Sequence, residues 1–244
     1  MNDAVVIKNY HPVEHNITGN FLYETNDWDL IELNYNVDSD ALKAWWNKML
    51  DEYPELVFNF NIHHEKLNLD KSKEMVENGY CGYYCGPIDG ITLAWPIERY
   101  EPLPPPFQCN RELYPEINSE TFIDDAKILP RFLFGYFKTL VTDLGIDAFR
   151  QAIVSRHYPG MYIKQHIDSK RLKLHIPIDT TEESYFHFGK NRERSYHMKL
   201  GKIYILNTGD WHGTSNNTEF ERTHLITRVT REQVMKVIGA TNAS

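Results

Sequence analysis

Three residues in the second half of the chain have the types and spacing of a metal site. His166 and Asp168 are two positions apart near the end of a predicted strand, and side chains two apart in a strand project to the same side. His212 follows Asp168 by 44 residues, at the start of another predicted strand. Two imidazoles and one carboxylate on one face of an octahedron leave three positions open, an arrangement associated with non-haem Fe(II) oxygenases. The pattern therefore predicts that His166, Asp168 and His212 bind one metal ion.

An arginine lies shortly after the second histidine. Arg222 follows His212 by ten residues in the segment FERTHLI, where a short hairpin-like excursion would return the chain to the metal end of the fold. A guanidinium group can bind a carboxylate through two parallel hydrogen bonds. We therefore expect Arg222 to hold the distal carboxylate of a dicarboxylic co-substrate. The alternative for an arginine in an ordinary strand is a surface position.

The region that carries these residues reads as a series of short strands. From Ala152 onward, segments rich in β-branched and aromatic residues are separated by turn residues. Seven or eight strands in about 80 residues predict an antiparallel sandwich or barrel, and the stretch REQVMKVIGA after them predicts a short helix. The segments are AIVSRHY, MYIKQHI, RLKLHIPI, SYFHFG, SYHMKL, KIYIL and RTHLITRV.

The first half of the chain is expected to be mainly helical. Helices are predicted over 39–53 and 69–79, and a third from 124 to 144 is interrupted at Pro130. The prolines between 102 and 106 predict a stiff, non-helical connection.

The spacing of these motifs resembles the aspartyl/asparaginyl β-hydroxylase family of 2-oxoglutarate oxygenases over about residues 150–230. The resemblance is carried by the segment from Ser155 to Gly160 (SRHYPG), then His166, RLKLHIPI, His212 and Arg222. It implies that Ser155 and Arg222 bind the distal carboxylate of 2-oxoglutarate. It also implies that His175 contacts the carboxylate nearest the metal.

The resemblance also leaves differences and weaker assignments. Animal members of the family have a glycine at the place of Asp168, so the chain is more similar to the bacterial hydroxylases of free amino acids. Lys173 matches a substrate-binding basic position of the family. Arg171 is two residues before it in the predicted strand and would project to the same face, so both are candidates to bind a substrate carboxylate. Trp211 precedes a metal ligand and is a candidate for the pocket wall, with a core position as the alternative.

The length and composition suit one folded domain. The chain has 244 residues, of which 41% are hydrophobic. We expect a mainly β fold with N-terminal helices and a double-stranded β-helix (jelly-roll, cupin-like) core. Within a single dioxygenase domain over 1–244, residues 1–149 would form a mainly helical support, 150–230 the barrel with the metal and 2-oxoglutarate sites, and 231–244 a C-terminal tail.

These features together predict an Fe(II)- and 2-oxoglutarate-dependent dioxygenase. It would use O₂ to hydroxylate an unactivated C–H bond, of an amino acid or an amino-acid side chain, while 2-oxoglutarate is converted to succinate and CO₂. The substrate would be a small molecule, an amino acid or a peptide. Two alternatives remain open: a cupin-type metalloenzyme that does not use 2-oxoglutarate, and a non-catalytic metal-binding β-barrel module.

Charge and hydropathy restrict the remaining classes of partner. The net charge of −8 argues against a general nucleic-acid binder, although residues 150–202 carry eleven Lys and Arg against five acids and so suit an anionic ligand. No stretch approaches a membrane span or an export signal, and the three cysteines are read as reduced structural thiols, so a cytoplasmic protein is expected. The oligomeric state is left open.

Overall fold

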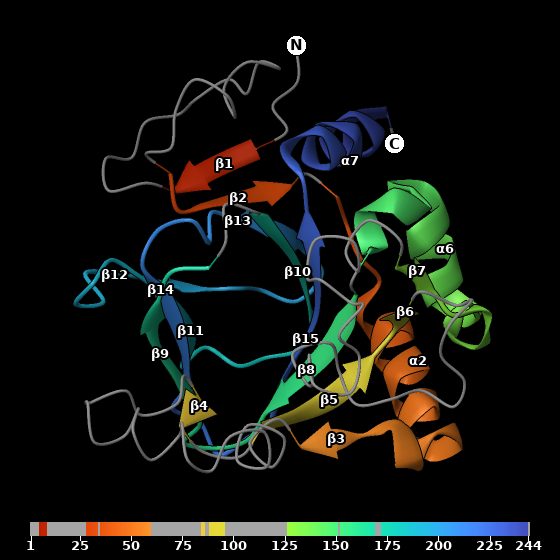
Figure 1. Ribbon diagram of the computed structural model, residues 1–244, viewed down its shortest axis with the longest axis horizontal. Helices are drawn as coiled ribbons and strands as arrows, with labels where there is room; N and C mark the ends of the chain where they lie inside the picture. Colours follow the sequence, from red (N-terminus) through yellow and green to blue (C-terminus); the bar gives the residue numbers. More distant parts are fainter. Residues whose placement is uncertain are drawn as a thin grey trace, which may run out of the picture.

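The protein, described by a computed structural model, folds around two antiparallel β-sheets that face each other (Figure 1). The described residues are 5–8, 28–33, 35–59, 84–85, 88–95, 126–150, 152–168 and 172–243.

The larger sheet, called the major sheet, has eight strands. Its spatial order is β1-β2-β13-β10-β15-β8-β5-β3, and every neighbouring pair is antiparallel. In that order the strands are β1 (Val5–Lys8), β2 (Leu30–Leu33), β13 (Ile203–Leu206), β10 (Leu172–Asp179), β15 (Arg222–Val229), β8 (Ile153–His157), β5 (Ile88–Thr92) and β3 (Phe58–Asn59).

The smaller sheet, called the minor sheet, has five strands in the order β12-β11-β14-β9-β4. These are β12 (Arg194–His197), β11 (Ser184–Phe188), β14 (His212–Asn216), β9 (Tyr162–His166) and β4 (Tyr84–Cys85). A separate pair joins β6 (Ala94–Trp95) to β7 (Lys127–Ile128).

The connection between the two sheets defines the fold. Strands β8 to β15 belong in turn to the major, minor, major, minor, minor, major, minor and major sheets. An eight-stranded, two-sheet arrangement of this kind is a jelly roll, the architecture of cupin-like proteins. The predicted double-stranded β-helix core is therefore confirmed, and all eight of its strands lie in the segment that the sequence pattern marked.

The major sheet has an apolar outer face and a polar inner face. In β10, the four residues with even numbers from Leu172 to Ile178 belong to the main hydrophobic cluster, whereas Lys173 and His175 alternate with them. In β15, Leu225 and Val229 join the same cluster, and side chains of opposite parity project to the other face. The inner face is thereby left for polar side chains.

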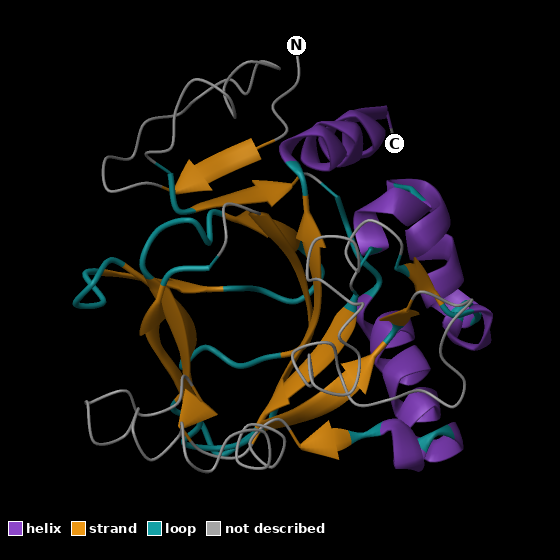
Figure 2. Cartoon of the chain, in the orientation of Figure 1, coloured by secondary structure: helices purple, strands orange, loops and turns teal. Residues whose placement is uncertain are grey.

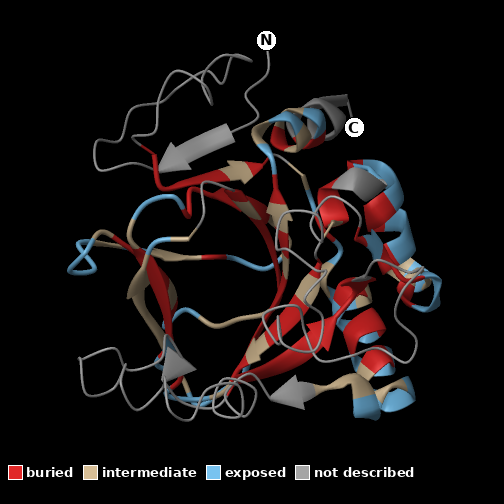
Figure 3. Ribbon diagram, in the orientation of Figure 1, coloured by how far each residue is buried: buried red, intermediate tan, exposed pale blue. Residues whose placement is uncertain are grey.

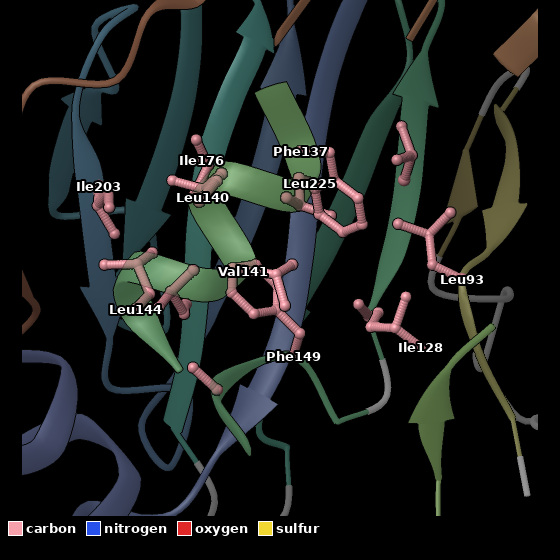
Figure 4. Packing of buried hydrophobic residues seen from close by; sticks show 14 of the residues in the cluster. Leu93, Ile128, Phe137, Leu140, Val141, Leu144, Phe149, Ile176, Ile203 and Leu225 are labelled. Carbon is pink, nitrogen blue, oxygen red and sulfur yellow. The ribbon is translucent and has the colours of Figure 1, made fainter. Parts of the chain in front are cut away.

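Helices cover the apolar face, as Figure 2 shows. They are α2 (Ser39–Glu52), α6 (Gly135–Leu144) and α7 (Arg231–Ala243), with 3₁₀ turns at η1 (Pro54–Leu56), η2 (Pro130–Phe132) and η3 (Ile146–Phe149). Figure 4 shows Phe137, Leu140 and Leu144 of α6 in one cluster with Ile176 and Leu225 of the sheet. Figure 3 shows the same pattern across the molecule: buried residues line the strands and the helix sides that face them.

The third predicted helix is shorter than expected. The sequence predicted a helix from 124 to 144, but among the described residues α6 begins only at Gly135, after β7 and η2. Pro130 explains the difference, because a residue before proline avoids the helical region and Leu129 is extended at ψ 135°. The predicted end is confirmed, since Gly145 terminates α6 with φ 84°.

The other predictions for the first half have mixed outcomes. The helix expected over 39–53 is present as α2, and Asp38 caps its N-terminus, because the Asp38 side chain accepts a hydrogen bond from the Ala41 amide. The described part of residues 1–149 is not only helical, since it also supplies β1 to β7. The helix expected over 69–79 and the prolines between 102 and 106 lie outside the described residues.

The packing of α6 on α2 gives a test of the fold. Phe137 is fully buried, and its ring stacks on Trp45 with 4.4 Å between centroids. Phe137→Ala is expected to lower the free energy of unfolding by about 3–5 kcal/mol, measured by urea denaturation. Phe220→Ala is the matched control, because that side chain is 66% exposed and its loss should cost less than about 0.5 kcal/mol. Equal losses in the two variants would contradict the packing described.

Candidate metal and anion site

The three predicted metal ligands lie together. One ligand atom from each of His166, Asp168 and His212 lies within 4.8 Å of the other two. The Nε2 atom of His166 is 3.7 Å from Asp168 Oδ1, and the Nε2 atom of His212 is 3.4 Å from Asp168 Oδ2. Two imidazole nitrogens and one carboxylate oxygen form the donor set of a facial triad, which leaves further positions on the ion open.

Strand pairing brings the two histidines side by side. His166 is the last residue of β9 and His212 the first of β14, and they are direct partners in the antiparallel pairing. Their ring centroids are 4.3 Å apart. Asp168 follows two residues after His166, and its backbone N–H donates to the Thr208 carbonyl at 3.0 Å. The main chain therefore fixes all three ligands.

Backbone carbonyls also set the orientation of both rings. His166 Nδ1 donates to the Lys164 carbonyl at 2.7 Å, and His212 Nδ1 donates to the Asp210 carbonyl at 2.9 Å. Each ring thus presents an unprotonated Nε2 toward Asp168, because its proton lies on the Nδ1 that donates to the carbonyl, as is usual for histidines that bind metal ions. Burial, reinforced by the nearby His212, lowers the pKa of His166 to about 4, so its ring is neutral at pH 7. His212 Nε2 is buried and has no hydrogen-bond partner among the described residues, which fits a metal ligand.

A lysine holds the carboxylate of the cluster. Lys173 Nζ forms an ion pair with Asp168 Oδ2, and both side chains are largely buried. Burial alone would raise the pKa of Asp168, but the ion pair with Lys173 opposes this effect, and the pKa lies below its usual range. Asp168 is therefore an anion at neutral pH, the form that binds a cation.

The predicted anion-binding arginine lies deep on the inner face of the major sheet. Arg222 is the first residue of β15 and is 2% exposed. Its Nη1 donates to His157 Nδ1 and its Nη2 to His224 Nδ1, each at 3.2 Å. Among the described residues, no carboxylate forms an ion pair with Arg222. A buried, uncompensated guanidinium is costly, so it predicts an anionic ligand.

The charge on this arginine remains in spite of its burial. Burial lowers the pKa of Arg222 to about 9, which still leaves the group protonated at pH 7. Burial, together with the charge of Arg222, holds the pKa of His157, His175 and His224 well below its usual value. The cluster is therefore one cation among neutral imidazoles.

A row of inner-face residues connects the arginine to the metal ligands. Ser155 of β8 is the direct strand partner of His224, and it is buried. His224 Nδ1 is 3.5 Å from His175 Nδ1 on β10. Two residues before His175 on β10, Lys173 projects to the same face and contacts Asp168. Ser155, His175 and Arg222, which the family resemblance grouped, therefore lie on one face.

The weaker substrate candidates have separate outcomes. Lys173 lies beside the metal ligands, as described above. Trp211 is half-buried rather than part of the hydrophobic core, and the ammonium of Lys190 lies 5.9 Å from its ring centroid. Arg171 lies outside the described residues.

The two histidines that contact Arg222 were not identified from the sequence. His157 and His224 each lie two positions after a residue that was identified, Ser155 and Arg222 respectively. The same two-residue alternation that linked His166 to Asp168 would have placed both on the inner face.

Comparison with known sequences supports the family assignment. Residues 131–232 match the family described as Aspartyl/Asparaginyl beta-hydroxylase, a segment that includes α6 and all strands from β8 to β15. The predicted family resemblance is confirmed. The matched aspartyl/asparaginyl β-hydroxylase segment is less than half of the chain, and a search of curated proteins finds no match.

Several solved structures are similar to this chain at low sequence identity and low TM-score. An oxidoreductase of the 2OG-Fe(II) oxygenase family from Burkholderia pseudomallei is 16% identical with TM-score 0.30, over 34% of this chain and 44% of that one. A Pseudomonas putida prolyl-4-hydroxylase is 9% identical with TM-score 0.39, over 82% of this chain and 91% of that one. An uncharacterized Klebsiella pneumoniae protein with a double-stranded beta-helix domain is 23% identical with TM-score 0.27, over 32% and 61%. The chain thus spans less than half of the Burkholderia protein.

The helices also bear on membrane association. Of the helices in the described part of the chain, none has the length and apolar character needed to cross a bilayer.

A glycine between the two histidine-bearing strands gives a test of the site. A Cβ added to Gly213 would lie 2.6 Å from the Ile163 carbonyl and would also overlap Gln165 Oε1, so β9 and β14 would have to separate. Gly213→Ala is expected to weaken metal binding by about 10–100-fold, the usual effect of disturbing ligand support. Calorimetry with Co(II) measures the affinity. Gly209→Ala is the control, since its nearest contact is an ordinary 3.4 Å; a similar loss there, or none at Gly213, would contradict the argument.

Proposed function

We propose that the protein is an Fe(II)- and 2-oxoglutarate-dependent dioxygenase that hydroxylates an unactivated C–H bond of an amino acid or an amino-acid side chain. The observation that carries the proposal is Arg222, a buried cation without a carboxylate partner among the described residues, on the inner face that leads to the His-Asp-His cluster. The family match supports a hydroxylase-type activity.

The donor set fits the metal that the family implies. His166, Asp168 and His212 would hold Fe(II), and their unprotonated nitrogens and ionised carboxylate need no further change of protonation. Bound iron with O₂ supplies the oxidising chemistry, in which 2-oxoglutarate is converted to succinate and CO₂ as the substrate is hydroxylated.

The protein's own groups would bind and orient the co-substrate. Arg222 would grip the distal carboxylate of 2-oxoglutarate through two N–H donors, and the Ser155 hydroxyl would donate a further hydrogen bond. His175, nearer the metal ligands, would contact the other carboxylate. The burial of all three side chains excludes water and so strengthens these contacts.

The substrate would bind beside the candidate metal ligands. Lys173, and Arg171 two residues before it, would supply cationic groups for a substrate carboxylate, and Trp211 would form part of the wall. Amino acids and peptides fit such groups, and screening them for stimulated succinate formation would identify the substrate class. If 2-oxoglutarate neither binds nor turns over, a cupin-type metalloenzyme of another kind or a non-catalytic metal-binding module remains.

Removal of any metal ligand should stop turnover without unfolding the protein. His166→Ala, Asp168→Ala and His212→Ala are each expected to abolish succinate formation, because each leaves an incomplete open-sided site. His197→Ala is the matched control, since it removes a half-buried imidazole that is not part of the cluster. Succinate assays and thermal melts on the purified variants make the comparison. Retained turnover in the His212→Ala variant would overturn the triad.

The two distal-carboxylate residues should contribute unequally. Loss of a buried charged partner in Arg222→Ala is expected to weaken 2-oxoglutarate binding by roughly 2–5 kcal/mol, against about 1 kcal/mol for the hydroxyl in Ser155→Ala. Arg222→Lys should recover only part of the loss, because an ammonium lacks the planar fork. Anaerobic calorimetry of 2-oxoglutarate with the Fe(II)-loaded variants gives the affinities. Unchanged affinity in Arg222→Ala would mean that the arginine has a structural role.

A further inference from the structure

Two histidines contact Arg222, and neither has a role in the family resemblance. His157 lies on β8 and His224 on β15, and both are buried. Each Nδ1 atom is 3.2 Å from one terminal nitrogen of the Arg222 guanidinium. The guanidinium is thus held from two sides by two different strands.

The chemistry of the partners fixes the protonation of both rings. A guanidinium carries five N–H donors and no acceptor, so an imidazole nitrogen that bonds to it must accept. Nδ1 of both His157 and His224 is therefore unprotonated. Because both rings are neutral, the proton of each lies on Nε2.

The neighbouring ring of His175 adds no further constraint. His175 Nδ1 is 3.5 Å from His224 Nδ1, whose single in-plane lone pair already accepts from Arg222. The two contacts of Arg222 therefore fix the tautomers of His157 and His224 and leave that of His175 open.

Neutral acceptors have a consequence that carboxylates would not have. A carboxylate beside Arg222 would orient the guanidinium but would also neutralise it and repel an incoming anion. An imidazole acceptor orients the same group and leaves its charge available. A long side chain held in one rotamer also loses less conformational entropy when a ligand binds.

We propose that His157 and His224 are positioning residues that hold the Arg222 guanidinium in a fixed orientation without neutralising it, so that it is prepared for the distal carboxylate of 2-oxoglutarate. This inference rests on the proposed function for its ligand. The geometry of the three residues does not depend on the ligand, and it is testable alone.

Histidine tautomers can be read directly by long-range ¹H–¹⁵N correlation spectra of the metal-free protein at neutral pH. The expected result is an Nε2–H tautomer for both His157 and His224, assigned by single substitutions. A proton on Nδ1 of His157 or His224 would overturn the inference, whether or not 2-oxoglutarate binds.

Substitutions at one position then separate orientation from charge. His224→Asn keeps an acceptor, because the Asn Oδ1 atom is as many bonds from Cα as the His Nδ1 atom. His224→Leu removes the acceptor, and His224→Asp supplies one that neutralises Arg222. The same three substitutions at His157 provide an independent series.

Anaerobic calorimetry of 2-oxoglutarate with Fe(II)-loaded protein measures the outcome. Affinity is expected to stay near wild type in the Asn variants, to fall about 10-fold or more in the Leu variants, and to fall furthest in the Asp variants. If the histidines only filled space, loss of the acceptor would not matter, and the Leu variants would bind 2-oxoglutarate as tightly as the Asn variants. Leu or Asp variants that bind as tightly as wild type would overturn the inference.

If the Leu variants do not fold, the Asn and Asp variants decide. If wild type binds no 2-oxoglutarate, the proposed function fails, and the tautomers still decide whether the histidines hold Arg222.

Discussion

The two-residue alternation of side chains in β8, β10 and β15 is the constraint on which the site depends. On one side of these strands, residues such as Leu174 and Leu225 pack under the helices. On the other side, His175 and Arg222 face the minor sheet. There the ring centroid of Phe186 lies 5.4 Å from that of His175. A shift of one residue in any of these strands would bury the charged groups under the helices and expose the core. The same strand register is therefore needed to bury the apolar side chains under the helices and to place the polar side chains in the site.

The polar face carries an electrostatic cost that the fold does not offset. Arg222 is buried beside neutral imidazoles, although an arginine that served only stability would be expected to have a carboxylate partner. Elsewhere the chain makes such pairs, for example between Arg194 and Asp29 and between Arg156 and Asp89, each with two hydrogen bonds. The contrast indicates that the positive charge at Arg222 is kept for a ligand. The His-Asp-His cluster has a similar feature, since His212 Nε2 is buried without a hydrogen bond from the described residues.

The parts of this arrangement that were predictable are those with local signals. The strands of the barrel follow from alternation and turn residues, and His166 and Asp168 follow from a spacing within one strand. The start of α6 could not be placed, because the effect of Pro130 competes with a pattern that otherwise looks helical. Strands such as β2, with four residues, are too short to show a period. Alternation along the strands could have placed His157 and His224 on the inner face, but their contact with one guanidinium depends on the register of β8 against β15, which the sequence does not show.

In the proposed function, metal held by the His-Asp-His cluster and the Arg222 guanidinium would bind the two ends of one molecule, 2-oxoglutarate. The most direct test is the visible absorption spectrum of the wild-type protein when Fe(II) and 2-oxoglutarate are mixed with it in the absence of O₂. Chelation of iron by the keto acid produces a metal-to-ligand charge-transfer band, and the account predicts that this band appears and saturates with one equivalent of each. Binding of Fe(II) without a band at any concentration of 2-oxoglutarate would contradict it.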